Sequence, residues 1–396
     1  MEIVYLNHNV IWHSAFHRCF HLAKFLVKRG HRVTIITNSP KNRFFWKISD
    51  IEGVQVVESP DLFMGPLRTG WDPINVFRRS VWCMSKWNKK NDVLVHAFDS
   101  RPTVIHPALA LKQALHCPLV IDWGDWWGHG GAARLRKPFW INFIFEPVET
   151  YYEESFKFEA DWLTCVSEPL RDRAVALGYP REHIEIIRNA SDPVEIRMLD
   201  RTECRHALGL KQDMFYAIFS GYVLYDLDMV FHSLAALTAM HDRVGLIVTG
   251  AADVTSWGCQ LEIVSPGTVS RAQLNQYLCS ANAALMPLSG HLANEARFPG
   301  KVGDYLAAGL PIVMNRVGDI ARILQQANLG VFCEPTPQGF GKALSALLQH
   351  PEEQRRLGQR GREFAETQFN WEHEVDRIEA IYQKLSVASQ SRTRTR

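Results

Sequence analysis

The chain has 396 residues, of which 46% are hydrophobic and 22% charged, and its formal net charge is +2. This length and composition are typical of a folded protein with two domains, and they exclude a low-complexity or disordered chain. No run of about 18 apolar residues occurs and the first ten residues lack the pattern of a signal peptide, so we expect neither a membrane span nor a leader. The eight cysteines are scattered without a CxxC pair, which argues against a zinc site or a disulfide framework and favours the cytoplasm.

The small net charge hides a segregation of charge along the chain. Residues 1–145 carry 19 Lys and Arg against 10 Asp and Glu, whereas residues 146–200 carry 6 against 13. A basic N-terminal region indicates an anionic neighbour, either a membrane surface or a phosphorylated substrate, although ordinary surface charge explains it equally well.

The first half of the chain alternates strand and helix patterns. Predicted strands lie at 2–7, 32–38, 92–97, 117–123, 160–167 and 183–189, and predicted helices at 14–29, 103–115 and 168–177. Apolar residues at helix spacing, such as Phe16, Phe20 and Ala23, support the first helix. This rhythm predicts a parallel sheet with helices on its faces.

The alternation restarts after a break near Asp192–Asp200. Predicted strands lie at 214–221, 243–250, 283–288 and 311–315, with helices at 227–240, 271–281 and from Lys301. We therefore predict an α/β protein of two doubly wound, Rossmann-like domains, at 1–195 and 196–370, which face a cleft. Ligands of such sheets bind beyond the carboxyl ends of the strands.

The stretch RFPGKVGDYLAAGLPIVMN (297–315) is the densest chemical signal. Pro299 and Gly300 suit the start of a helix whose free N–H groups form an anion site, and Lys301 adds a full positive charge. Asp304, one turn along, is a good acceptor for a vicinal diol such as ribose. The stretch thus fits a nucleotide diphosphate, although a Lys–Asp surface pair on an amphipathic helix is an equally ordinary explanation.

The stretch also resembles the donor-site motif P-x-K-x-x-[E/D]-Y-L-A-x-G-x-P-I-V of retaining nucleotide-sugar glycosyltransferases of family 4, which have the GT-B fold. Residues 29–37 and 165–192 resemble further segments of that family in the right order, and the resemblance covers roughly residues 1–385. It implies that residues 371–390 form a helix that crosses back to the N-terminal domain. It also implies that Lys301 binds the donor diphosphate and acts as a catalytic residue, and that Asp304 binds the ribose.

Two departures from the family pattern stand out. The family often has an acidic residue eight positions before the ribose-binding carboxylate, where this chain has Ala296, with Asn294 and Glu295 nearby. The loop from Gly221 to Asp228 lacks the usual basic residue, for which Arg297 is a candidate substitute. The predicted donor-binding residues are therefore Lys301, Asp304, Gly300, Arg297, Glu295, Asn294 and Gly221.

The loop IDWGDWWGHGG (121–131) follows a predicted strand of the N-terminal domain. Tryptophan faces stack on sugar rings and carboxylates accept hydroxyl hydrogen bonds, so the loop fits an acceptor platform; a core aromatic cluster is the alternative. The predicted catalytic residues here are Asp125 and Asp122. The predicted acceptor-binding residues are His8, His13, Trp123, Trp126, Trp127, His129 and His96.

Two stretches raise the question of a membrane. In VFRRSVWCMSKWNKK (76–90), Phe77, Val81 and Met84 share one helical stripe while Arg79, Lys86 and Lys90 share another; RLRKPFWINFIF (134–145) joins a basic cluster to aromatics. Both suit an anionic membrane surface, and both suit a core equally well.

We therefore expect a glycosyltransferase that moves a sugar from a nucleotide-diphosphate donor to a glycan or lipid-linked acceptor, with retention of configuration. We expect no metal and no cofactor, no nucleic-acid partner, and a cytoplasmic location, peripheral on the membrane if the two stretches bind it. Two alternatives remain: a GT-B pseudoenzyme that binds a glycan or partner without turnover, and a nucleotide-sugar epimerase. A Rossmann dehydrogenase is disfavoured because no GxGxxG follows the first strand.

Overall fold

The computed structural model describes residues 1–13, 15–40, 44–62, 70–87, 92–135, 140–221, 227–238, 241, 243–250, 254 and 261–394. The chain divides into two compact units. The N-terminal unit comprises Met1–Arg188, Ala296–Phe298 and Trp371–Arg396, and the C-terminal unit comprises Asn189–Glu295 and Pro299–Asn370. The chain thus passes into its second unit after Arg188, where the prediction had residue 195, and returns at Trp371.

A parallel sheet forms the middle of the N-terminal unit. Its strands are β1 (Glu2–Val10), β2 (Arg32–Asn38), β3 (Lys47–Ile51), β4 (Val54–Ser59), β5 (Val93–Phe98), β6 (Leu119–Trp123), β7 (Trp162–Cys165) and β8 (Ile184–Ile186). Within the described residues the order is β3-β4-β2-β1-β5-β6-β7-β8, and only β3 is antiparallel to its neighbour. Nearly every residue of the central strands β1 and β5 is buried, as the apolar runs of the sequence predict.

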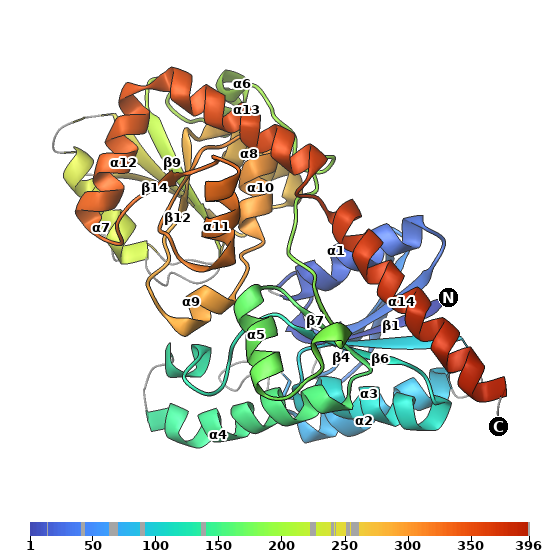
Figure 1. Cartoon of the computed structure of the whole chain (residues 1–396). Helices are drawn as coiled ribbons and strands as arrows, with labels where there is room; N and C mark the ends of the chain where they lie inside the picture. Colours follow the sequence, from blue (N-terminus) through green and yellow to red (C-terminus); the bar gives the residue numbers. More distant parts are fainter. Residues whose placement is uncertain are drawn as a thin grey trace. The chain divides into compact units, whose positions relative to one another are not determined.

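Helices cover both faces of this sheet (Figure 1). They are α1 (Ala15–Lys28), α2 (Pro73–Trp87), α3 (Pro102–Leu115), α4 (Trp140–Ser155), α5 (Glu168–Ala176) and α14 (Trp371–Arg394), with short 3₁₀ turns η1 (Ala132–Leu135), η2 (Phe156–Glu159) and η3 (Arg181–His183). Helices α1 and α14 pack together on one face, whereas α2 and α3 pack together on the other. The N-terminal unit is therefore doubly wound.

The β3–β4 hairpin was not predicted from the sequence. Its two-residue loop is Glu52-Gly53, and both residues have positive φ, +52° and +80°. This is the type I′ geometry, whose twist matches that of the flanking strands. Asp50 stabilises the turn, because its carboxylate accepts a hydrogen bond from the backbone N–H of Gly53 at 3.0 Å.

Helix α14 supplies part of the core of the N-terminal unit. The Tyr382 hydroxyl is 3.0 Å from the Tyr5 hydroxyl and 2.6 Å from His96 Nδ1, and all three side chains are buried. Trp371 stacks on His21 with the ring centroids 5.2 Å apart. The last helix of the chain is therefore an integral layer of the first unit.

The C-terminal unit is built on a second parallel sheet. Its strands are β9 (Phe215–Ser220), β10 (Val244–Thr249), β11 (Glu262–Gly267), β12 (Ala283–Met286), β13 (Ile312–Met314) and β14 (Val331–Phe332). Within the described part of the chain the order is β11-β10-β9-β12-β13-β14, and each strand in this order is parallel to its neighbours.

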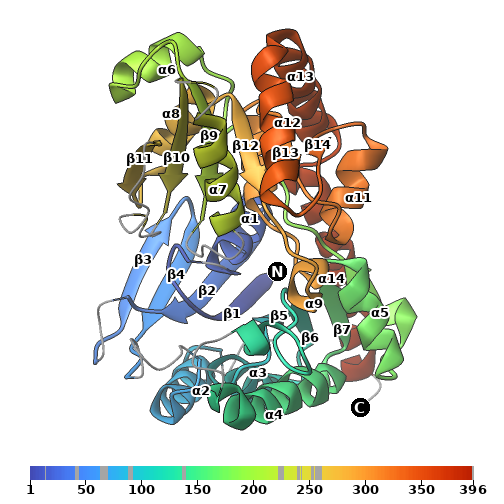
Figure 2. The same cartoon turned by 90° about the vertical axis from the view of Figure 1, so that its left-hand side faces the viewer.

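The helices of this unit are α6 (Arg201–Leu208), α7 (Leu227–Thr238), α8 (Arg271–Ser280), α9 (Leu292–Ala296), α10 (Lys301–Ala307), α11 (Gly318–Gln326), α12 (Pro337–Gln349) and α13 (Pro351–Thr367). Helices α7 and α12 pack side by side over one face of the sheet (Figure 2), while α8 and α10 contact the strands from the other (Figure 1). The predicted α/β fold with two doubly wound sheets is confirmed. No helix in the described ranges is long and apolar enough to cross a membrane.

Candidate functional site

The start of α10 lies at the carboxyl end of β9 in the C-terminal unit. Gly300 is the N-cap of α10, as predicted, and Lys301 is its first residue. The Lys301 ammonium lies 3.7 Å from the centroid of the Phe219 ring. A Cβ added at Gly221 would lie 3.0 Å from Lys301 Nζ, so any larger residue at 221 would displace the ammonium from its present position.

The carboxyl ends of β9 and β10 approach each other closely beside Lys301. Gly250 has φ of +114°, and a Cβ there would lie only 2.2 Å from the Gly221 carbonyl oxygen. The Tyr305 hydroxyl accepts a hydrogen bond from the Ser220 backbone N–H at 2.9 Å, which ties α10 to the end of β9. These contacts bring a cation and close-packed backbone to the edge where ligands of doubly wound sheets bind.

The small residues in and after α10 serve close packing. A Cβ at Gly303 would lie 2.6 Å from the Ala190 carbonyl oxygen. After the helix, a Cβ at Gly358 of α13 would lie 2.1 Å from the Gly309 carbonyl oxygen. The small residues thus let α10 pack on the 190–191 segment and let α13 approach its end.

Asp304 is engaged by an arginine that the sequence analysis missed. Arg271 NH1 and NH2 donate to the two oxygens of Asp304 at 3.0 and 2.9 Å. Arg271 Nε also donates to Glu195 at 3.1 Å. Although burial opposes it, the charge of Asp304 raises the pKa of Arg271, which stays a full cation. No local pattern in the sequence links positions 195, 271 and 304. The one local signal is Ser270-x-x-Gln273, the capping box that marks the start of α8 and so places Arg271 in its first turn.

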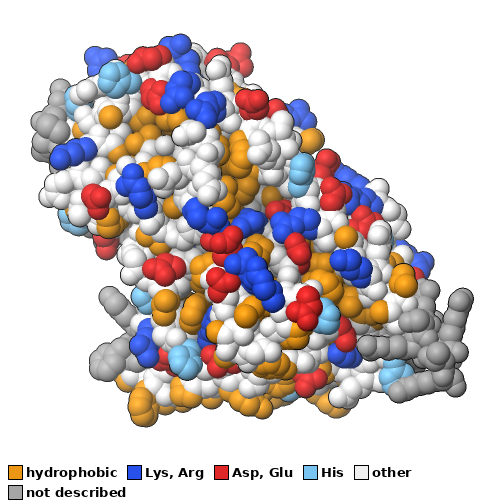
Figure 3. All heavy atoms as spheres, in the orientation of Figure 1, with side chains coloured by type: hydrophobic (Ala, Val, Ile, Leu, Met, Phe, Trp, Pro, Cys, Tyr) orange, Lys and Arg blue, Asp and Glu red, His pale blue; other side chains and the backbone are white. Residues whose placement is uncertain are grey.

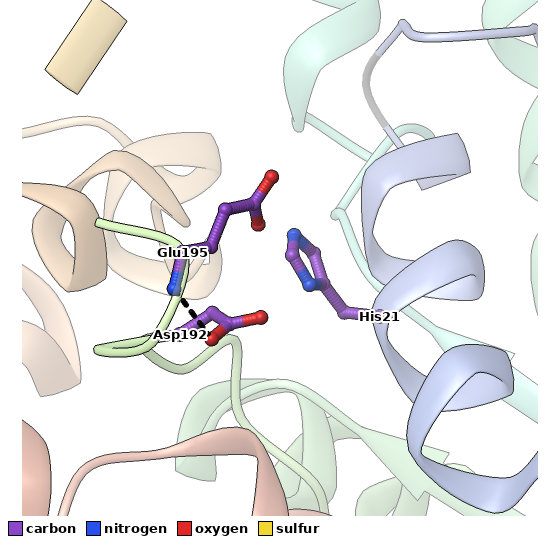
Figure 4. Close-up of side chains that lie close together, drawn as sticks. All are labelled: His21, Asp192 and Glu195. Atoms are coloured by element: carbon purple, nitrogen blue, oxygen red, sulfur yellow. Dashed lines mark hydrogen bonds between the residues drawn. The ribbon is translucent and has the colours of Figure 1, made fainter. Parts of the chain in front are cut away.

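Glu195 belongs to a turn that Asp192 stabilises. Asp192 Oδ1 accepts hydrogen bonds from the backbone N–H groups of Val194 and Glu195 at 3.2 and 3.1 Å, and Figure 4 shows the second of these. His21, drawn in the same figure, is a residue of the N-terminal unit.

The remaining predicted donor residues are spread over two units. Asn294 and Glu295 lie in α9; Asn294 is buried and its amide donates to the Ser289 carbonyl at 2.9 Å, whereas Glu295 is exposed. Arg297 belongs to the N-terminal unit. Burial raises the pKa of Asp125 to about 6, and the positive charge of Arg297 opposes this rise. The Asp125 side chain nevertheless reaches solvent. The loop that lacks the usual cation falls largely on residues 222–226, outside the described residues.

Asp122, predicted as catalytic, is a buried structural carboxylate, so that prediction is corrected. It lies inside β6 and is 2% exposed. Arg18 of α1 holds it through two hydrogen bonds, from Nε at 2.9 Å and from NH2 at 2.8 Å, and the Thr164 hydroxyl adds a third at 2.5 Å. Its carboxylate thus clamps a helix to the sheet and is out of reach of a substrate.

Trp123 is also a core residue, and its predicted role as an acceptor platform is corrected. The ring is 2% exposed and lies near the cations of Lys157 and Arg173, each 5.1 Å from its centroid. Its Nε1 donates to Glu153 at 2.8 Å, and Glu153 also accepts from the backbone N–H of Trp127 at 2.9 Å. The buried Glu153 thus fixes the start of the loop from inside.

The rest of this loop is more accessible. Trp126 and Trp127 are half-buried, with Arg173 4.0 Å from the first ring and Arg101 5.0 Å from the second. His129 is exposed, has φ of +47° and lies 3.4 Å from Glu154. Asp125, Trp126, Trp127 and His129 are therefore the accessible members of the predicted acceptor loop.

Two of the three predicted histidines outside this loop are buried within strands. His8 lies within β1 and His96 within β5, so neither is in a loop, and burial lowers the pKa of each to about 3. His8 Nδ1 is 3.5 Å from Asp99, while His96 is solvent-inaccessible and bonded to Tyr382. Only His13, in the turn after β1, is exposed. A fully enclosed His96 offers no surface to an acceptor.

Two family models match the chain. A model described as "Glycosyltransferase Family 4" matches residues 17–195, and one described as "Glycosyl transferase-like" matches residues 231–380. A relative from Bacillus anthracis, N-acetyl-alpha-D-glucosaminyl L-malate synthase, is 35% identical over 80 residues, which are 20% of this chain and 21% of the relative. The match spans about a fifth of the length of the curated relatives.

Solved structures match over almost the whole chain. Sucrose-phosphate synthase from Thermosynechococcus elongatus has a TM-score of 0.75 at 16% identity, covering 98% of this chain and 99% of that one. Anabaena Alr3699/HepE, solved with UDP and glucose, has a TM-score of 0.68 at 12% identity, covering 97% and 100%. At these identities the likeness concerns the fold.

Proposed function

We propose that the protein is a glycosyltransferase of the family 4 type, which transfers a sugar from a nucleotide-diphosphate donor to a glycan or lipid-linked acceptor; the two family matches and the likeness to solved GT-B structures support this. The donor would bind the C-terminal unit at the start of α10. The acceptor would bind the N-terminal unit at the loop that carries Asp125, Trp126 and Trp127. We further propose that the reaction retains the anomeric configuration and requires no metal.

One observation carries the donor part of this proposal: Lys301 holds its ammonium at the carboxyl end of β9, against Gly221 and Phe219. In the reaction, the bond between the sugar and the diphosphate breaks, and negative charge builds up on the departing phosphate oxygen. A fixed cation beside that oxygen stabilises the transition state more than the ground state. The sugar carbon becomes oxocarbenium-like as the bond breaks.

Asp304 would accept hydrogen bonds from the ribose hydroxyls through lone pairs that Arg271 leaves open. Each carboxylate oxygen takes one hydrogen bond from Arg271, and an ionised carboxylate offers about four acceptor sites. Arg271 would hold the plane of the Asp304 carboxylate fixed, so that its open acceptor sites meet the diol.

Calorimetric titration with UDP, GDP and ADP tests the donor site, and UDP comes first because HepE was solved with it. A hydrogen bond to a charged group contributes about 1.5–3 kcal/mol, so Lys301→Ala should weaken the preferred nucleotide by about 10- to 150-fold. Lys342→Ala, an exposed lysine on α12, is the matched control and should change nothing. Nucleotide binding that Lys301→Ala leaves intact would contradict the proposal. A donor-hydrolysis assay then separates a transferase from a protein that binds without turnover.

We also propose that α2 and α4 bind an anionic membrane surface. Phe77 and Val81 of α2 are 69% and 52% exposed, and Trp140 and Phe143 of α4 are 59% and 89% exposed. Figure 3 shows hydrophobic side chains along the lower edge of the N-terminal unit, where α4 runs. One predicted basic residue is corrected: Arg79 is fully buried and donates to Ser59, Asn7 and Thr103. Lys90 lies outside the described residues.

Co-sedimentation with vesicles of phosphatidylglycerol and phosphatidylcholine tests this surface. Inserting a phenylalanine into the membrane contributes about 1.5–3 kcal/mol, so Phe143→Glu should lower the vesicle affinity by roughly tenfold or more. Val194→Glu, which alters a 70% exposed valine of the C-terminal unit, should leave binding unchanged. If Phe143→Glu and Val194→Glu sedimented with the vesicles to the same extent, the proposal that α4 binds the membrane would be refuted.

A further inference from the structure

A polar cavity lies at the amino ends of the strands of the C-terminal unit. Its volume is about 680 Å³, within the range of sites for small molecules. Phe215 begins β9, Arg243 immediately precedes β10, and Asn282 immediately precedes β12; all three line the cavity. Lys301 and Gly221 lie at the carboxyl end of the sheet, so the cavity is separate from the candidate donor site.

Three arginines from two segments line this cavity. Arg201 and Arg205 come from α6, and Arg243 immediately precedes β10. Asp213 is the one carboxylate among the described lining residues, and it pairs with Arg243 at 3.2 Å. The described lining therefore carries an excess of positive charge.

The Arg201 guanidinium is only partly satisfied within the described structure. Its Nε is buried without a hydrogen-bond partner, and among the described residues no carboxylate forms an ion pair with it. Burial lowers the pKa of this guanidinium, although the negative charge of Asp200 opposes that effect. Burial and the charge of Arg201 likewise lower the pKa of Arg205 to about 10. Buried guanidiniums that repel one another are stabilised by an anion that accepts their free N–H groups.

The other lining groups suit a ligand with a carbon skeleton. Met214, Phe215 and Leu348 form an apolar part of the wall. The side chains of Asn282 and Gln354 hydrogen-bond each other at 3.3 Å, and Arg205 donates to Asn282 at 2.7 Å, so these amides are already committed. Arg201, together with the exposed Arg243, is thus the lining cation that remains to bind an anion.

We propose that this cavity is a second ligand site, which binds the phosphate group of a small phosphorylated metabolite through Arg201 and Arg243. The planar guanidinium fork matches the oxygens of a phosphate, and the apolar wall takes the body of the ligand. The site lies away from the residues proposed for sugar transfer, so its occupant regulates or stabilises the protein and does not react.

Calorimetry and thermal unfolding with inorganic phosphate, pyrophosphate and glucose 6-phosphate test the site. We expect at least one of these probes to bind and to raise the melting temperature. Arg243→Gln, which alters an exposed side chain and leaves the fold intact, should weaken that binding by about tenfold, and Arg201→Gln should do the same. Glucose 6-phosphate binding more tightly than phosphate would show that the apolar wall contacts the body of the ligand; equal affinities would restrict the site to the phosphate group.

Two controls separate this site from its surroundings. Arg356→Gln alters an arginine on α13, which pairs with Glu353, and should leave binding unchanged. Lys301→Ala removes the proposed donor cation and should also leave it unchanged. The proposal is overturned if no probe binds at millimolar concentration, if Arg201→Gln and Arg243→Gln both bind like the parent, or if Lys301→Ala alone abolishes binding.

Discussion

The ion pair between Arg18 and Asp122 gives the sharpest test of how the N-terminal unit is built. Both side chains are buried, at 5% and 2% exposure, and two hydrogen bonds join them. Removing one partner of a buried pair leaves the other charge uncompensated, which costs about 3–5 kcal/mol. For units of this size each kcal/mol corresponds to about 2–4 °C, so Asp122→Ala should lower the melting temperature of the unit by roughly 6–20 °C.

The assay is thermal unfolding followed by circular dichroism, with Asp172→Ala as the control. Asp172 is a 63% exposed carboxylate that also pairs with an arginine, and its loss should shift the free energy of unfolding by about 0.5 kcal/mol or less. The double variant Arg18→Met/Asp122→Leu should be more stable than Asp122→Ala, because it leaves no buried charge. If Asp122→Ala melted like the parent but lost transfer activity, Asp122 would be catalytic and the structural interpretation would be wrong.

The same pair predicts how stability depends on acid. Burial alone would raise the pKa of Asp122, but the charge and hydrogen bonds of Arg18 lower it below its ordinary value. The contribution of Asp122 is therefore complete above about pH 4 and is lost as pH falls through the lower pKa of the folded state. Asp122→Asn should show a smaller loss of stability than the parent between about pH 4 and pH 2.

Three further outcomes follow from the described contacts. Arg271→Met should lower the affinity for whichever of UDP, GDP and ADP binds by about tenfold, and it should reduce the preference for the ribonucleotide over its 2′-deoxy form. Arg271→Lys should restore part of this preference. An unchanged preference in Arg271→Met would show that Arg271 does not orient Asp304. Gly250→Ala should disrupt the packing of the β9 and β10 ends and so abolish nucleotide binding, because the φ of +114° and the Gly221 carbonyl leave no room for a Cβ. The backbone strain alone should cost about 1–3 kcal/mol. A nucleotide titration that matched the parent would contradict this packing. The pKa of His96 is lowered to about 3, so the unfolded chain takes up a proton below about pH 6.5 that the folded chain refuses, and stability should fall with pH from there; His96→Gln should flatten this slope in unfolding measured from pH 7 to pH 4.

The sequence predicted the elements whose signal is local. Apolar runs predicted the buried strands β1, β5 and β9, and glycine and proline bracketed α10 at 300 and 309–311. The hairpin β3–β4 was missed because its strands are short and its turn, Glu52-Gly53, is not one of the common hairpin dipeptides. Periodicity thus predicted the two doubly wound sheets but not their edges.

The sequence could not predict which polar groups meet. Asp122 and Asp125 look alike in a loop rich in tryptophan, yet one is clamped by Arg18 from another element and the other reaches solvent. Arg79 shares a helical stripe with Lys86, but its guanidinium turns inward to the carbonyls of Asn7 and Thr103. Partners that lie tens or hundreds of residues away decide whether a charge is buried or exposed, and local pattern carries no record of them.

Helix α14 has a consequence for the order in which the protein is made. The N-terminal unit needs Tyr382 to satisfy Tyr5 and His96, but residues Asn189–Asn370 must leave the ribosome before that helix exists. At about 5–20 residues per second, this interval lasts roughly 10–40 s. During this time the nascent first unit exposes the face that α14 will cover, while the second unit can already fold, so the half that is synthesised first is completed last.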